Sequence, residues 1–292
     1  MRAKIYLVLG LSVCTAAGIQ ACSTSGGIDK NTEYVLEYKS AGFSDRKYTA
    51  EYDWKASMEM QGQPMNADRL FKFLYSMAGK ETGGGKSSLA SVTYENVDAK
   101  MIMAQGQQKF DTRHINGTSF DMEISPNGSR LSFPKPDQLP RLDMGSMAGG
   151  ELDLTFILKY NFPALPDLPV KWLDTWREIF HRTWIEGSIP VTAEINATHA
   201  YVDVENIEGY DCLKIESTYA AEIEGSADQY GSNWLYQGKL EGTATWYFAL
   251  EQGFVVLASY AESTTGTITT QGENAMEVPI KQTISVEIKQ AK

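Results

Sequence analysis

The chain has 292 residues, of which 42% are hydrophobic and 11% aromatic, and it carries 26 basic against 37 acidic side chains. This length suits one large β domain or two smaller halves. The net charge of −11 argues against a nucleic-acid-binding protein, which needs a basic surface, and against adhesion to anionic lipid by charge alone.

A short secretory signal opens the sequence. Two basic residues precede an apolar run over 5–13, which is too short to span a bilayer as a permanent helix. The run Ile19-Gln20-Ala21-Cys22 resembles the lipobox of bacterial lipoproteins. We therefore predict that residues 1–21 are a signal peptide and that Cys22 becomes a lipidated N-terminus. The alternative is ordinary cleavage after Ala21 with no lipid.

A lipid anchor on Cys22 also indicates where in the cell the protein is located. Acyl chains such as palmitate on Cys22 would give stable membrane attachment. Ser23 follows the cysteine, and in the sorting pattern known for enteric lipoproteins a residue other than Asp there favours the outer membrane. We expect a lipid-anchored protein of the bacterial cell envelope that faces the periplasm. Residues 22–32, rich in Gly and Ser, are the expected tether to a single β-rich domain over 33–292.

The longest predicted elements form a hairpin that begins at Tyr48. From Tyr48 to Met60 every second residue is apolar or aromatic, and the residues between are polar. Side chains of a strand point alternately to its two faces, so this pattern predicts a strand with one dry and one wet face. Such a strand would span roughly 46 Å, against the usual length of about five or six residues. A turn at Gly62 follows, and the alternation then resumes to Met77, broken only by Arg69.

Several shorter strands are expected around this hairpin. The loop over 79–87 is rich in Gly but lacks the spacing of a phosphate-binding loop, so we interpret it as surface. The shorter predicted strands cover 33–39, 90–94, 101–104 and 120–124.

Residues 134–150 interrupt the strand pattern with three prolines and three glycines. We interpret them as the connection between two halves of the fold, about 33–133 and 151–292, and leave open whether the halves are related. Beyond this connection, the apolar residues of 151–162 and 172–184 fit the periods of both a helix and a strand. The pattern alone leaves these two segments open.

The alternation is regular again after Pro190. It predicts a hairpin over 191–224 that turns at Glu208-Gly209, and strands around 240–250, 254–260 and 276–288. The whole pattern predicts a mainly β protein: a large, curved antiparallel sheet or open half-barrel with one to three short helices. We expect strand content above about 40%, against a usual value of about 20–25%.

Three short motifs resemble a known family. They are Gly242-x-x-x-Trp246-x-Phe248 with Gly253-x-Val255, Tyr210-Asp211-Cys212-x-x-Ile215-Glu216, and Leu165-Pro-x-x-Pro169-Val170 with Asp174-Thr175-Trp176. They look like an uncharacterised family of bacterial lipoproteins that is similar to the LolA, LolB and LppX group. The resemblance covers roughly 33–289 and implies an open half-barrel with helices across a concave side that binds a hydrophobe. It also implies a strand over 174–184 and a covering helix over 151–160.

The sequence offers little for catalysis. His114, His181 and His199 are far apart, and we find no metal-ligand spacing, nucleophile motif or Cys–His pairing. With Cys22 lipidated, Cys212 is the one thiol left in the mature chain, so no disulfide is expected and we interpret it as a small core residue. We expect neither an enzyme nor a metal or cofactor. A hydrolase with an unrecognised site is a weaker hypothesis than the two binding functions described next.

The dry faces of the strands indicate a binding concavity. They are rich in aromatic residues and methionine, and methionine recurs at adaptable apolar sites, although such stripes are more often plain core. Long curved sheets leave a concavity that side chains or a ligand must fill. We predict that a lipid or other hydrophobic molecule binds there; the alternative is a structural or assembly lipoprotein that holds a protein partner of the envelope. The predicted ligand-binding residues are Trp54, Met58, Phe71, Phe73, Trp246 and Phe248.

Overall fold

The computed structural model describes residues 27–60, 62–80, 87–145, 150–186, 189–229, 232–270 and 275–291. The predicted signal peptide and Cys22 lie outside these residues, as does most of the loop over 79–87. Strands make up 68% of the structure and helices 5%, which confirms the prediction of a mainly β protein.

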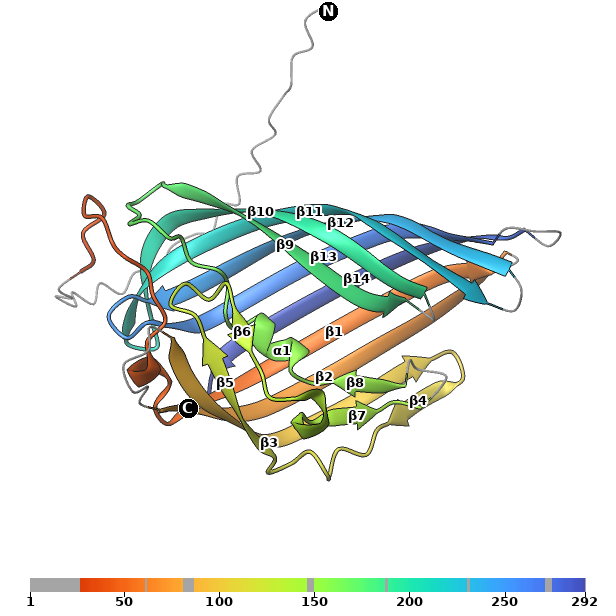
Figure 1. Cartoon of the computed structure of the whole chain (residues 1–292), viewed down its shortest axis with the longest axis horizontal. Helices are drawn as coiled ribbons and strands as arrows, with labels where there is room; N and C mark the ends of the chain where they lie inside the picture. The colour runs from red at the N-terminus through yellow and green to blue at the C-terminus, as the bar shows by residue number, and fades with distance from the viewer. Residues whose placement is uncertain are drawn as a thin grey trace, which may run out of the picture.

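One antiparallel sheet of 12 strands forms most of the fold (Figure 1). Its edges are β6 and β9, which do not pair with each other among the described residues, so the predicted open half-barrel is confirmed. In spatial order the strands are β6 (Leu131–Ser132), β5 (Ser119–Ile124), β3 (Ser88–Met103), β2 (Gln63–Lys80), β1 (Arg46–Met60), β14 (Glu277–Gln290), β13 (Phe254–Thr270), β12 (Ser232–Ala249), β11 (Tyr210–Gln229), β10 (Ile189–Ile207) and β9 (Thr175–Glu186), with β4 (Gly106–Lys109) beside β3.

The long hairpin predicted from the sequence is confirmed as β1 and β2. The two strands pair over the whole of β1, with Arg46 opposite Met77. On its other side β1 pairs with β14, the last strand of the chain, with Tyr48 opposite Gln290. Strands from the two ends of the chain are thus neighbours, and both halves contribute to one continuous sheet.

The second half of the sheet also follows the predicted alternation. β10 and β11 form the predicted hairpin, and Glu208 and Gly209 between them have φ of 51° and 90°. Two positive φ angles in a two-residue connection match the twist of the flanking strands. The ambiguous segment 172–184 is a strand, β9, whose even-numbered side chains face the concave side while the odd-numbered ones are exposed.

The concave side is partly covered by residues 133–145 and 150–166, which we call the covering segment. It contains η2 (Pro136–Gln138), the small hairpin of β7 (Arg141–Asp143) and β8 (Glu151–Asp153), and α1 (Phe156–Lys159). Figure 1 shows these elements in front of β2 and β3. The hydroxyl of Tyr94 on β3 donates a 2.8 Å hydrogen bond to the Leu154 carbonyl, which ties the covering segment to the sheet.

The covering helix expected over 151–160 is much shorter than predicted. Residues 151–153 are strand, and the helix is a single turn over 156–159. The Asp153 carboxylate accepts hydrogen bonds from the backbone N–H and the hydroxyl of Thr155, so the chain turns there instead of continuing a helix. The prolines of 163–169 then require extended backbone.

The strand predicted over 33–39 is wrong. Tyr34 forms one isolated bridge with Val170, Tyr38 donates its N–H to Pro126, and Lys39 donates to Gly253. The backbone bonds of this extended segment go to three different parts of the chain, so no ladder forms. The segment runs across one end of the sheet and connects its loops.

The two short strands predicted at 90–94 and 101–104 are parts of one strand, β3, of 16 residues. Its register with β2 shifts between Leu74 and Tyr75. Tyr94 and Val97, three residues apart, are therefore both buried. An irregularity of this kind changes which residues face inward. The apolar alternation of the sequence therefore breaks after Tyr94, although the strand continues.

Cys212 is a core residue, as predicted. It lies on β11 with no exposed surface, and burial raises the pKa of its thiol to about 12.

Substitutions at two neighbouring positions of β2 test the alternation. Phe73 is buried against the rings of Phe71, Tyr94 and Phe156, so Phe73→Ala should lower the free energy of unfolding by about 3–5 kcal/mol. Lys72 is on the outer face, where it pairs with Glu51, so Lys72→Ala should change it by less than about 1 kcal/mol. Urea unfolding of the soluble domain measures both values. Similar losses for the two variants would contradict the assignment of faces.

Candidate functional site

Side chains from strands that are far apart in the sheet meet on its concave side. Arg182 on β9 donates to both carboxylate oxygens of Glu262 on β13, at 2.8 and 3.0 Å, although β10, β11 and β12 lie between these strands. Glu186 on β9 also accepts a 2.7 Å hydrogen bond from Gln282 on β14. Neighbouring strands are about 4.8 Å apart, so a flat sheet would separate β9 from β13 by about 19 Å. The sheet therefore curls until β9 faces β13 and β14 across an interior that we call the lumen.

One end of the lumen is filled by the protein itself. The covering segment packs there against the inner faces of β1, β2 and β3 in a continuous apolar core. Four of the six predicted ligand-binding side chains lie in this core and are almost completely buried by their neighbours, which leaves them little free surface for a ligand. They are Phe71, Phe73, Trp246 and Phe248.

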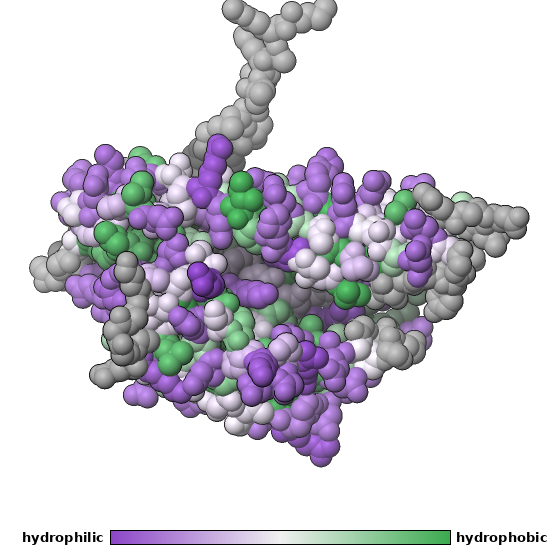
Figure 2. All heavy atoms as spheres, viewed as in Figure 1, coloured by the Kyte–Doolittle hydropathy of each residue, from purple (hydrophilic) through white to green (hydrophobic). Residues whose placement is uncertain are grey.

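Towards the other end the lumen is less filled. A smaller apolar cluster lines the inner faces of β10, β12 and β14 there. Figure 2 shows a hollow across the middle of this face of the molecule, between β9 and the covering segment of Figure 1. We call this region the open half. Half-buried, inward-facing side chains of the open half are Trp54, Met58, Phe180, Trp184, Trp234 and Ile268, of which Trp54 and Met58 were predicted from the sequence.

The Arg182–Glu262 pair forms the polar centre of the lumen. The Glu262 side chain is only 2% exposed, and the hydroxyl of Tyr160 on the covering segment lies 3.5 Å from its carboxylate. Burial disfavours the charged form of Arg182, but contact with Glu262 outweighs burial and raises the pKa of Arg182. Burial, followed by the nearby carboxylate, raises the pKa of the Tyr160 and Tyr219 hydroxyls. These groups form a fixed ion pair surrounded by neutral phenols.

The close packing around this pair depends on a glycine. Gly242 on β12 is the cross-strand partner of both Tyr219 and Glu262. A Cβ at this position would lie 2.2 Å from the ring of Tyr219. Glycine is therefore required for the tyrosine ring to lie flat over the sheet beside the ion pair.

Arg69 is a second cation on the inner face, on β2. It lies opposite Trp54 on β1 and Met101 on β3. Its guanidinium carbon is 4.3 Å from the centroid of the Trp54 indole ring. Burial lowers the pKa of Arg69. In the sequence, Arg69 was the residue that broke the apolar alternation, so this signal was present but was not interpreted as part of a site.

His199 belongs to a polar group that sequence spacing did not reveal. Its Nδ1 is 2.7 Å from the Ser217 hydroxyl and its Nε2 is 3.5 Å from the Glu178 carboxylate. The three residues come from β9, β10 and β11, and the His199 ring lies between Trp176 and Trp246, with centroid distances of 5.3 and 5.0 Å. His199 and Ser217 are both buried in the core. We interpret the group as a polar contact between strands, because the serine hydroxyl is closed to a substrate.

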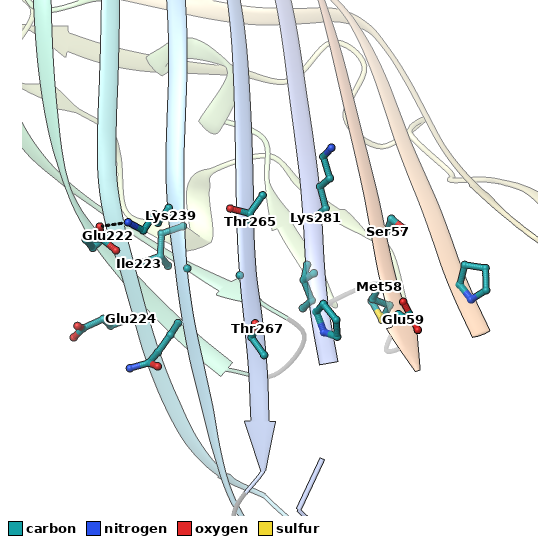
Figure 3. Close-up of a pocket in the computed structure, with 16 residues that line it drawn as sticks. Ser57, Met58, Glu59, Glu222, Ile223, Glu224, Lys239, Thr265, Thr267 and Lys281 are labelled. Carbon is teal, nitrogen blue, oxygen red and sulfur yellow. Dashed lines mark ion pairs between the residues drawn. The ribbon is translucent and has the colours of Figure 1, made fainter. Parts of the chain in front are cut away.

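Two depressions lie on the outer face of the sheet. The first, of about 840 Å³, contains a row of polar side chains from five neighbouring strands, in which Lys239 pairs with Glu222 at 3.2 Å (Figure 3). Thr265, Lys281 and Ser57 continue this row on β13, β14 and β1. The second depression, of about 850 Å³, is lined mainly by outward Thr, Ser, Asp and Lys residues. Both depressions are open and solvated, so we do not assign a ligand to either.

The described residues contain no group of three or more His, Cys, Asp or Glu residues placed to hold a metal ion. The same residues include no helix with the length and apolar character needed to cross a membrane.

Comparison with known proteins does not assign the chain to a family: no family model matches it, and no curated protein matches it. Solved structures from Pseudomonas aeruginosa are matched over most of the chain. OccK2 (OpdF) is 6% identical, with 86% of this chain and 100% of that chain covered and a TM-score of 0.27. OccK11 (OpdR) is 9% identical, with coverages of 88% and 100% and a TM-score of 0.22. TM-scores this low do not show a shared fold, and no function is transferred from these structures.

Breaking the ion pair tests whether it holds the curl of the sheet. Arg182→Met would leave the Glu262 carboxylate buried without its partner, so we expect a loss of about 3–5 kcal/mol in the free energy of unfolding. Adding Glu262→Leu to this variant should restore much of the loss, because no buried charge then remains unpaired. Urea unfolding of both variants measures the difference. A single variant as stable as the wild type would contradict a structural role for the pair.

Proposed function

We propose that this protein is a lipid-anchored protein of the bacterial cell envelope that binds a lipid or other hydrophobic molecule in the open half of the lumen. The observation that carries the proposal is the set of aromatic side chains that face the open half and are only half-buried, among them Trp54, Phe180 and Trp184. Apolar side chains turned towards a hollow gain free energy when a ligand removes them from water.

The energy available from such a contact is sufficient for binding. Each 100 Å² of apolar surface removed from water contributes about 2.5 kcal/mol. A few hundred Å² would therefore exceed the cost of association for a small ligand and give an affinity in about the micromolar range. No conspicuous polar motif is needed, which is consistent with the lack of one in the sequence.

The open edges of the sheet provide a route into the lumen. β9 pairs with β10 on one side only, and the hollow of Figure 2 lies between β9 and the covering segment. A ligand with a long tail could therefore enter from the side, without threading through a closed barrel. We propose binding rather than catalysis, because His199 and Ser217 are buried.

The proposed lipid anchor is consistent with one end of the fold. Gly27, the first described residue, is five positions after Cys22, a reach of at most about 18 Å. The bridge between Tyr34 and Val170 joins two segments at this end, and large apolar side chains are exposed on both. They are Val35, Leu168, Trp172 and Leu173. With Cys22 acylated, this end would lie close to the bilayer surface, where Trp and aliphatic side chains are favourable.

Binding of a fluorescent fatty acid to the soluble domain tests the proposed function. Saturable binding is expected for the mature chain that carries Cys22→Ser. Trp184→Ala should weaken fatty-acid binding about tenfold. The indole of Trp184 is half-buried in the free protein, so roughly half of its apolar surface is available to contact the ligand. Ile185→Ala is the matched control, because Ile185 is the next residue of β9 and points to the outer face. Absence of saturable binding to the unsubstituted domain would refute the proposal.

Membrane fractionation tests the anchor. Cys22→Ser should release a folded protein into the soluble periplasmic fraction, because the acyl chains would be its stable attachment. Cys212→Ser leaves the predicted lipidation site intact and should stay with the membrane. A Cys22→Ser protein that still sediments with membranes in high salt would contradict the lipoprotein proposal.

A second candidate function is attachment of a protein partner along β9. This edge strand has 12 residues and pairs only with β10 among the described residues. Its outward residues Ile179 and Ile185 are 63% and 61% exposed. A long edge with exposed β-branched residues can accept a strand from another chain.

Photo-crosslinking in cells distinguishes this second function. A photoreactive residue at Ile179 should give one discrete adduct with an envelope protein, and Ile179→Lys combined with Ile185→Lys should prevent complex formation. The same probe at Lys239, on the outer face of β12, is the control. Equal and diffuse labelling from both positions would argue against a partner on β9.

A further inference from the structure

Among the described residues, the charged side chains that face the lumen make direct polar contacts, with one exception. Arg182 pairs with Glu262, Glu186 accepts from Gln282, and Glu178 is 3.5 Å from His199. At the closed end, Arg46 donates to the hydroxyl of Tyr210 and lies over the ring of Phe254. Among the described residues, the guanidinium of Arg69 has no hydrogen-bond acceptor and no ion-pair partner, and its Nε is buried.

Arg69 is half-buried, so its unpaired cation is partly removed from water. Transfer of a charge from water to an apolar site is unfavourable unless it is paired, and buried charges in proteins are normally paired. Glu186 is near enough to favour the charged form of Arg69 through space, but neither it nor any other described carboxylate contacts the guanidinium directly. The hydrogen-bonding positions of Arg69 are therefore not used within the described chain.

The geometry leaves Arg69 free to meet a counter-charge. Trp54 contacts the guanidinium near its ring centre, at 4.3 Å. Such a contact stabilises the cation and restricts its movement. Arginine carries five N–H donors in a planar fork that matches the two oxygens of a carboxylate or phosphate. The half-buried Met58 and Trp184 of the open half then supply apolar surface beyond this position.

We propose that the ligand of the lumen is an amphiphile with an anionic head group, a carboxylate or a phosphate, and that Arg69 binds this head group while the open half binds the tail. This inference rests on the proposed function, because it assigns a ligand class to the same site. Binding would bring a negative charge to a cation that lacks one and would cover the apolar side chains around it.

Titration calorimetry with matched probes on the mature Cys22→Ser protein tests this assignment. The probes are dodecanoate, dodecyl phosphate, dodecanol and inorganic phosphate. We expect the two anionic amphiphiles to bind at least tenfold more tightly than dodecanol, and inorganic phosphate to bind more weakly than all three.

Variants then assign the preference to Arg69. Arg69→Met should remove the preference for the anionic probes and leave dodecanol affinity within about twofold, while Arg69→Lys should retain part of the preference. Arg177→Met is the control, because Arg177 is exposed on the outer face of β9, and should change nothing. Melting temperatures of all variants confirm that they fold; if Arg69→Met does not fold, the Arg69→Lys comparison decides.

Each other outcome overturns a different statement. Equal affinity for dodecanoate and dodecanol in the unsubstituted protein, unchanged by Arg69→Met, would overturn the anionic head group and leave the hydrophobe-binding function intact. Inorganic phosphate binding as tightly as dodecyl phosphate would indicate a simple anion site and overturn the amphiphile. Failure of every probe to bind would overturn the proposed function itself.

Discussion

The curl of the sheet determines almost everything else in this structure. Twelve strands in one sheet would expose a very large apolar face if the sheet were flat. Contacts across the lumen, led by the bidentate Arg182–Glu262 pair, hold β9 over β13 and β14. Covering the concave side from one end, the segment that carries α1 and the β7–β8 hairpin supplies the rest of the core. We assign to a ligand the part of the lumen that is filled neither by the contacts across it nor by the covering segment.

Polar contacts join β9 both to strands across the lumen and to its neighbour in the sheet. The Arg182–Glu262 pair reaches β13, the Glu186–Gln282 bond reaches β14, and the contact of Glu178 with His199 reaches β10. Polar contacts have strict geometry, whereas apolar packing tolerates sliding. We infer that these contacts fix the register at which β9 lies over the lumen. Arg69 differs from them because its guanidinium has no hydrogen-bond or ion-pair partner among the described residues.

The fold could be predicted in large part because side-chain alternation is a local property. It predicted β1, β2 and the strands from β10 onwards, since each has one dry and one wet face over most of its length. It failed where backbone bonds depend on distant segments: residues 33–39 are extended but bond to Pro126, Val170 and Gly253 instead of a strand. In β3 the register shift near Tyr94 hid the continuity of the strand.

The site was harder to predict for the same reason. Inward direction could be predicted for Trp54 and Phe73, but whether each faces a hollow or the core depends on where the covering segment ends. The pairing of Arg182 with Glu262 cannot be seen in the sequence, because 80 residues separate them and only the curl brings them together. Arg69 was visible as a break in the alternation, but only the structure shows that its guanidinium lacks a direct partner among the described residues.

Native mass spectrometry of the mature Cys22→Ser protein, isolated from the periplasm under mild conditions, tests the central claim most directly. The account predicts a population that carries one bound amphiphile, released at higher collision energy as a discrete anionic mass. That population should be strongly reduced in Arg69→Met and unchanged in Arg177→Met. A single apo mass for the unsubstituted protein, under conditions that preserve its fold, would contradict the claim that the open half of the lumen is a ligand site.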